Sequence, residues 1–149
     1  MLKKSAQYVI IALEISFLGS TFLYMTRSEL IDYICSFYGA TAEYPFDTDQ
    51  SITVFRHADN RKWFAIIMTV PKNKLVLGAE GYADIVNLKV EREMTCSLWQ
   101  ENGIFPAYHM SKAHWISAFL DESVDDGTLE WLISVSFKLT ETKKKAKKF

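Results

Sequence analysis

Glycine, proline, cysteine and histidine are scarce in this 149-residue sequence, which contains 6 Gly, 3 Pro, 2 Cys and 3 His. So little glycine and proline excludes a collagen-like repeat and a low-complexity linker. Cys35 and Cys96 form no C-x-x-C pair, which excludes a cysteine-stapled miniprotein and a zinc knuckle built on cysteine. We expect both cysteines to be buried, reduced thiols of a cytoplasmic protein.

The sequence also lacks the motifs of the common catalytic and phosphate-binding classes. It contains no G-x-S-x-G motif, and Gly78 and Gly81 match neither a dinucleotide-binding loop nor a P-loop. Paired acids occur only in turn-like stretches, where carboxylates are usually solvated or cap helices. The spacing of His109 and His114 is neither helical nor that of a zinc knuckle. The sequence therefore predicts no catalytic residue, no metal site and no cofactor, and it identifies no small-molecule substrate.

The composition is that of one globular domain with an uneven charge distribution. Apolar residues make up 49% of the sequence and aromatic residues 14%. The formal net charge of −1 combines +1 on residues 1–24, −6 on residues 25–140 and +4 on residues 141–149. Nucleic-acid-binding domains usually carry a basic surface, because neutralising phosphates supplies most of their affinity. The acidic body as a whole does not have that character, whereas the lysine-rich tail at residues 141–149 does.

Residues 1–24 form an apolar N-terminal extension for which three interpretations compete. Glu14 interrupts the apolar stretch and no small-x-small cleavage site follows, which disfavours a signal peptide. The same acid makes the short stretch a marginal membrane span. Thr26 and Glu29 match a capping box, so Met25 stands where a domain would begin. An upstream extension of the reading frame, a membrane anchor and an accessory helix therefore stay open as alternatives.

The periodicity of apolar residues in the body predicts an α+β fold. Three- and four-residue spacing indicates helices, whereas alternation and β-branched runs indicate strands. The expected helices are 27–38, 91–102 and 126–139, and the expected strands are 51–56, 62–70, 74–78, 85–90, 105–110 and 113–120. We expect one compact domain at residues 25–140, with a largely antiparallel sheet and N-terminal, middle and C-terminal helices.

The few cations of the body concentrate at the expected turns between strands. Three such groups occur, near residues 56–62, 72–74 and 112–114, and the first contains His57. Cationic hairpin tips with nearby aromatic rings suit contacts to a nucleic-acid backbone. Charged hairpin tips are also common without any such function. The candidate nucleic-acid-binding residues are Arg56, Arg61, Lys62, Lys72, Lys74, Lys112 and His114.

The densest chemical cluster, IFPAYHMSKAHW at residues 104–115, resembles the signature of the bacterial MmcQ/YjbR family. Other family landmarks follow in the expected order, among them YPF at 44–46 and VNLK at 86–89. Ala107 and Ser111 stand where the family pattern has Gly and Asn. The signature residues present are Tyr108, His109, Met110, Lys112, His114 and Trp115.

This resemblance implies a frataxin-like (CyaY-like) fold with a double wing of β-hairpins, in a bacterial cytoplasmic protein of a family proposed to bind DNA. The leading hypothesis is therefore a non-catalytic protein that contacts the DNA backbone through basic hairpin loops. One alternative is an interaction module whose acidic surface docks a protein partner, and another is a small-ligand or metal site near His109 and His114. A membrane is an expected partner only if residues 1–24 are an anchor.

Overall fold

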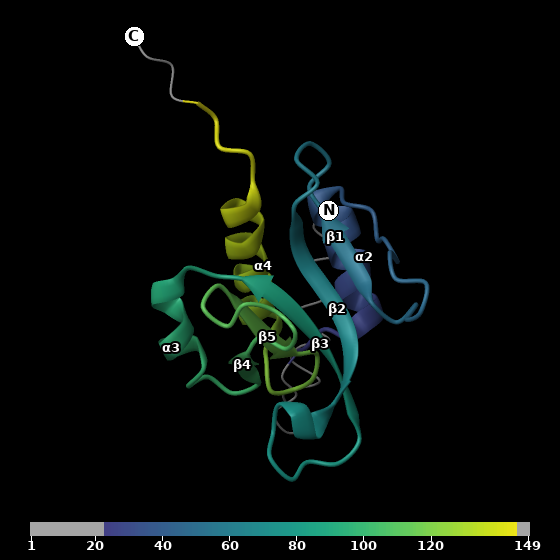
Figure 1. The fold of residues 1–149 in the computed structure, drawn as a ribbon, viewed down its shortest axis with the longest axis vertical. Coiled ribbons are helices and arrows are strands. Elements are labelled where there is room, and N and C mark those ends of the chain that lie inside the picture. The colour runs from purple at the N-terminus through teal and green to yellow at the C-terminus, as the bar shows by residue number, and fades with distance from the viewer. Residues whose placement is uncertain (1–22, 146–149) are drawn as a thin grey trace, which may run out of the picture.

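The structure, a computed structural model, describes residues 23–145, so the interpretation of residues 1–24 lies almost entirely outside it (Figure 1). An antiparallel sheet with strand order β1-β2-β3-β5-β4 carries the helices, which confirms the α+β fold class. No helix within residues 23–145 has the length and apolar character of a membrane span. The elements are α2 (Arg27–Tyr38), β1 (Thr53–Arg56), β2 (Trp63–Pro71), η1 (Lys72–Lys74), β3 (Tyr82–Lys89), η2 (Arg92–Met94), α3 (Thr95–Leu98), β4 (Ile104–Pro106), β5 (Trp115–Phe119) and α4 (Asp126–Thr140).

Helix α2 begins and ends where the sequence predicts, because both of its ends are capped. The Thr26 hydroxyl accepts a hydrogen bond from the Glu29 backbone, and the Glu29 carboxylate accepts one from the Thr26 backbone at 2.8 Å. Gly39 ends the helix in the left-handed conformation, with a φ of 64°. Leu30 and Ile34, four residues apart, are fully buried, so α2 packs its apolar side against the sheet.

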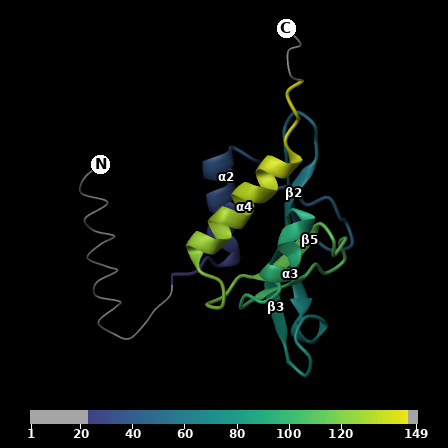
Figure 2. The same ribbon diagram turned by 90° about the vertical axis from the view of Figure 1, so that its left-hand side faces the viewer.

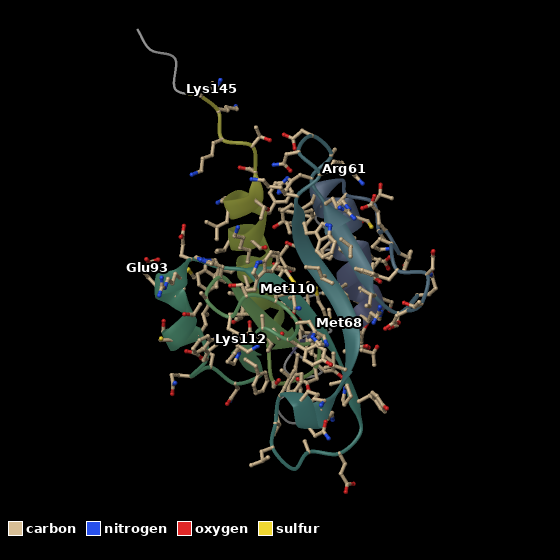
Figure 3. The ribbon with its side chains drawn as sticks, in the orientation of Figure 1. Arg61, Met68, Glu93, Met110, Lys112 and Lys145 are labelled. Atoms are coloured by element: carbon tan, nitrogen blue, oxygen red, sulfur yellow. The ribbon has the colours of Figure 1, made fainter. Side chains whose placement is uncertain are left out.

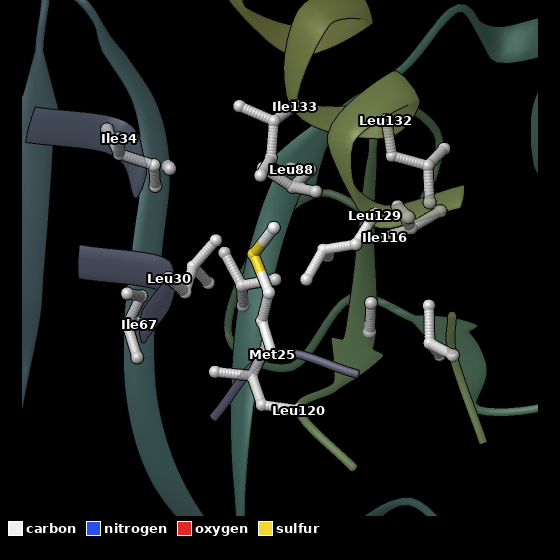
Figure 4. Packing of buried hydrophobic residues seen from close by; sticks show 14 of the residues in the cluster. Met25, Leu30, Ile34, Ile67, Leu88, Ile116, Leu120, Leu129, Leu132 and Ile133 are labelled. Carbon is white, nitrogen blue, oxygen red and sulfur yellow. The ribbon is translucent and has the colours of Figure 1, made fainter. Parts of the chain in front are cut away.

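Helices α2 and α4 cover the same face of the sheet (Figures 1 and 2). Leu129 and Ile133 of α4 belong to one core cluster with Ile67 of β2 and Leu88 of β3, and Ile133 lies beside Leu88 in Figure 4. Met25, just before the N-cap of α2, is buried in the same cluster. Full burial of one such side chain stabilises the fold by about 1.5–3 kcal/mol relative to exposure. This core fixes the sheet on which the candidate sites lie.

The opposite face of the sheet carries a second apolar cluster, which loops cover in place of α2 and α4. Alternation along β2 directs Ile67 toward the helices and its neighbours Ile66 and Met68 toward this second face. Half-buried Tyr108 and Met110, from the loop between β4 and β5, pack onto it. The side chains that bury this face therefore come partly from irregular segments.

The expected strand at residues 74–78 is wrong. These residues belong to η1 and to the loop that connects β2 with β3. Leu75 reaches the second apolar cluster, but Leu77 is 100% exposed. The short apolar run at residues 75–77 that suggested a strand therefore belongs to a loop with one anchoring side chain.

The expected helix at residues 91–102 is also wrong in extent, since α3 is a single turn that follows η2. The hydroxyls of Thr95 and Ser97 donate to backbone carbonyls three residues earlier, at 2.8 and 3.2 Å. Such bonds compete with regular helix extension. Cys96 is exposed and Cys35 is only partly buried, so the prediction of two buried thiols is wrong.

Gly103, which precedes β4, is the glycine whose replacement we expect to be most damaging. Its φ is 74°, and an added Cβ would collide with the Ser123 hydroxyl and lie 2.7 Å from Val124 Cγ2. Gly81 has a similar φ of 82° but open space around it. Gly81→Ala should lower the free energy of unfolding by about 1–2 kcal/mol, and Gly103→Ala by at least about 1 kcal/mol more. Urea unfolding measures both, and equal losses would contradict this account.

Candidate functional site

The seven predicted nucleic-acid-binding residues do not form one surface. Two groups lie at opposite ends of β2, a nine-residue strand that spans roughly 30 Å at about 3.3 Å per residue (Figure 1). A third group lies in the loop between β4 and β5. The structure places Arg56, Arg61 and Lys62 at the β1–β2 turn, Lys72 and Lys74 in η1, and Lys112 and His114 in the β4–β5 loop.

Glu43 holds two of the predicted cations in ion pairs. Its carboxylate accepts from Arg56 Nε at 2.8 Å and from Arg61 Nη2 at 2.6 Å. Two backbone hydrogen bonds with Val54 fix Glu43 beside β1. The Arg61 hydrogen bond, aided by Arg56, holds the pKa of the Glu43 carboxyl below its usual range. The Arg56 guanidinium also lies 5.2 Å from the centroid of the Trp63 ring, so it is committed to two neighbours.

The segment that ends α4 docks onto the β1–β2 turn. His57 Nε2 shares a 2.8 Å hydrogen bond with Thr140 Oγ1, and Asn60 Nδ2 donates to the Thr140 carbonyl at 2.8 Å. Just beyond the helix, the Thr142 hydroxyl donates to an Asp59 carboxylate oxygen at 2.8 Å. His57 is therefore buried beneath this contact, in contrast to its expected place at an open hairpin tip.

Because of this docking, lysines from the end of α4 and the C-terminal segment lie near the β1–β2 turn, although they are distant from it in the sequence. A hollow of about 560 Å³ opens between the turn, the end of α4 and the C-terminal segment. Arg61 and Lys145 lie toward the same end of the molecule in Figure 3, well away from Lys112. We call this region the cationic end, with seven basic and three acidic side chains: Arg56, Arg61, Lys62, Lys138, Lys143, Lys144 and Lys145, with Glu43, Asp59 and Glu141.

Residues 107–114, here called the signature loop, do not continue the strands as alternation predicts. Two buried side chains hold the loop backbone at Tyr108 instead. The Tyr108 amide donates to Ser117 Oγ at 2.9 Å, and its carbonyl accepts from Asn87 Nδ2 at 2.8 Å. The Ser117 hydroxyl donates to Asn87 Oδ1 at 2.5 Å and closes the network. These bonds replace a strand ladder and hold the loop over the second face of the sheet.

Three of the six signature side chains are packing residues. Tyr108, Met110 and Trp115 are partly buried against the second apolar cluster. Asn87 and Ser117, which anchor the loop, are not among the predicted site residues, although the sequence contains a signal for them. Each is a polar residue at an otherwise apolar, buried strand position, and such a residue requires hydrogen-bond partners.

The other signature side chains reach the surface. Lys112 Nζ donates to the Ala107 carbonyl at 3.1 Å and so closes the signature loop on itself. His109 has a left-handed φ of 57°, and its ring lies 4.0 Å from that of Tyr108. His109 and His114 are both exposed. Within residues 23–145, no three His, Cys, Asp or Glu side chains group in a way that could hold a metal ion.

A separate cavity of about 310 Å³ lies beneath the signature loop. Its walls come from β2, from the signature loop and from the segment before β1. Most of the lining side chains are aromatic or apolar, and Asp49 contributes the one carboxylate among them. The described residues thus present two candidate sites of different chemistry, a cationic end and an aromatic cavity, which have no lining residue in common.

Comparison with known proteins finds relatives along most of the chain. The YjbR family model matches residues 35–139. The uncharacterised protein YyaQ of Bacillus subtilis is 37% identical over 116 residues, which cover 78% of this chain and 98% of the relative. The uncharacterised protein YjbR of Escherichia coli K12 is 29% identical over 114 residues, or 76% of this chain and 85% of the relative.

Solved structures have the same fold. A crystal structure of a protein from Pseudomonas syringae superposes with a TM-score of 0.77 at 38% identity, covering 78% of this chain and all of the other. A crystal structure of a Deinococcus radiodurans protein has a TM-score of 0.59 at 24% identity, covering 85% of this chain and 86% of the other. The second similarity extends to the fold alone.

Loss of the Ser117 hydroxyl should loosen the signature loop. Ser117→Ala leaves the Tyr108 amide and Asn87 Oδ1 buried without their partner, which costs about 1–3 kcal/mol of unfolding free energy. The loop amides should also exchange hydrogen faster. The control is Ser97→Ala, which removes an exposed hydroxyl and should change stability by less than about 0.5 kcal/mol. Unchanged loop protection in Ser117→Ala would show that the network does not anchor the loop.

Proposed function

The chain belongs to the YjbR family, and we propose that it binds the phosphate backbone of nucleic acid, with DNA as the expected form, through its cationic end. The observation that carries the proposal is the docking of the C-terminal segment onto the β1–β2 turn. That contact places lysines from residues 138–145 beside the basic hairpin predicted from the sequence. Basic groups converging on one surface are the feature on which phosphate binding depends.

The chemistry of the cationic end favours phosphate contacts without base reading. Lys62, Lys138 and the lysines at 143–145 are exposed and have long, flexible side chains. Lysine acts as a point charge, so such groups follow a backbone without requiring a fixed geometry. Phosphate contacts position a protein but carry no sequence information directly. We therefore expect binding that depends strongly on salt and little on sequence.

The seven candidate residues have unequal roles in this proposal. Lys62 belongs to the binding surface, whereas Arg56 and Arg61 contribute less because Glu43 already neutralises part of their charge. Lys72 and Lys74, at the far end of β2, lie outside the surface. Lys112 is engaged with the signature loop and is left out with its neighbour His114. This division supplies matched variants for the experiments.

The salt dependence of DNA binding tests the surface directly. Replacing Lys143, Lys144 and Lys145 by Gln should lower the slope of log K against log salt by about 0.9 for each lysine that neutralises a duplex phosphate. Lys62→Gln should lower the slope by up to the same amount, because the turn and the tail form one surface. Fluorescence anisotropy with a labelled random-sequence duplex measures the slope in the full-length protein.

The matched control is the double variant Lys72→Gln/Lys74→Gln, which removes similar charges from the opposite end and should leave the slope unchanged. A slope reduced equally by this control would place binding elsewhere. An effect of the tail variant without any effect of Lys62→Gln would mean that the tail binds alone and the fold does not. No binding at low salt would overturn the proposal and favour a protein partner for the acidic body.

Removing one acid should strengthen binding. Glu43→Gln releases Arg56 and Arg61 from their ion pairs and removes a negative charge from the cationic end. We expect tighter DNA binding and a slope steeper by up to about 2, one unit for each freed guanidinium. Glu93→Gln, in η2 and outside the cationic end, is the charge-matched control (Figure 3). Equal changes in both variants would show that only total charge matters.

A further inference from the structure

The cavity beneath the signature loop has a chemistry unlike that of the cationic end. Phe46 and Trp63 both line it, with ring centroids 6.2 Å apart and planes at 85°. Tyr108 and His109 line it from the signature loop. Two perpendicular rings in one wall, with a third aromatic residue contributed by the loop, resemble the corner of an aromatic cage.

Two methionines complete the apolar part of the lining. Met68 projects from β2 and Met110 from the signature loop, and both side chains lie over the second face of the sheet (Figure 3). Thioethers are polarizable and pack well against alkyl groups. A volume of about 310 Å³ is at the lower limit for ligand pockets, so it suits a small molecule.

The charge of the lining is negative. Asp49 lines the cavity, and its Oδ1 atom accepts from the Ser51 amide at 2.9 Å and from the Ser51 hydroxyl at 2.5 Å. These bonds, with a smaller contribution from the nearby Arg27, hold the pKa of the Asp49 carboxyl below its usual range. Asp49 is therefore ionised at neutral pH, and no lysine or arginine is among the residues that line the cavity.

The surrounding cations are engaged elsewhere. Arg27 donates to Thr69 Oγ1, Thr53 Oγ1, the Ser51 carbonyl and Asp84, and it does not line the cavity. Arg56 lies over the Trp63 ring from outside the cavity, which illustrates that this indole accepts a cation. An anionic or phosphorylated ligand would meet the Asp49 carboxylate without a compensating charge. A cation would meet both the carboxylate and the negative faces of the rings.

We propose that this cavity binds a small quaternary ammonium compound, with its N-methyl groups against Phe46, Trp63 and Tyr108 and its charge balanced by Asp49. The methyl groups match the apolar lining, which a hydrated primary ammonium would not. The signature loop supplies one wall, so its anchoring by Asn87 and Ser117 keeps the cavity formed before the ligand arrives. This proposal does not rest on nucleic-acid binding at the cationic end.

Choline and its uncharged carbon isostere, 3,3-dimethyl-1-butanol, separate the charge from the shape. Calorimetric titration of the full-length protein should give a choline affinity about five- to thirtyfold higher than that of the isostere. In ¹⁵N-labelled protein the Trp63 indole N–H resonance should move with choline, while that of Trp131, exposed on α4, should not. Equal affinities, or no shift of Trp63 at saturating choline, would overturn the proposal.

Substitutions in the cavity lining test where choline binds, and comparison with the isostere separates loss of charge from a change of fold. Asp49→Asn keeps the acceptor for Ser51 but removes the charge, and it should lower choline affinity at least about fivefold while leaving the isostere unaffected. Asp47→Asn, on the same exposed segment but outside the lining, should leave both affinities unchanged. Trp63→Leu should abolish the preference for choline. Retention of that preference in both Asp49→Asn and Trp63→Leu would exclude this cavity as the site.

Discussion

Burial of both faces of the β2–β3 pair is the constraint on which the rest of the structure depends. The two strands pair without interruption from Ala65 with Leu88 to Pro71 with Tyr82. Helices α2 and α4 cover one face, but the other has only loops to exclude water. Loops bury an apolar face only if their own polar backbone is satisfied, which is the task of Asn87 and Ser117. The aromatic cavity is a consequence of this partial covering.

The regular elements that face the main core were predictable from the sequence. Apolar residues recur at helical spacing in α2 and in the first half of α4, and Thr26 and Asp125 are good N-caps. Local signals of this kind indicate both the type of an element and its boundary. The prediction of secondary structure from the sequence was wrong where local hydrogen bonds or loop contacts compete with the pattern of apolar residues. In the single-turn helix α3, the hydroxyls of Thr95 and Ser97 donate to backbone carbonyls, a type of bond that competes with regular helix. At residues 74–78, a short apolar run lies in a loop that anchors one leucine and exposes another.

The candidate sites were predictable only in part. The periodicity of the strands predicts that the basic residues lie at turns, but it does not predict which residues form ion pairs or hydrogen bonds with them. Glu43 meets Arg56 and Arg61 across 13 and 18 residues, and Thr140 meets His57 across 83. Such pairings depend on how elements pack, which no local pattern encodes. The family resemblance correctly marked the signature loop, yet half of its distinctive side chains prove to be packing residues.

The contact between the β1–β2 turn and the end of α4 has a consequence for synthesis of the protein. The hairpin leaves the ribosome some 80 residues before the helix end that buries His57. During that interval the turn lacks its partner, because the lysines that will adjoin it have not yet been synthesised or have not yet left the ribosome. Contacts of such long sequence separation also form late in folding, because chain entropy must first be lost. The cationic end is thus complete only after residues 138–145 have been made, so a product that stops before them carries the acidic body without four of the seven basic side chains of this surface.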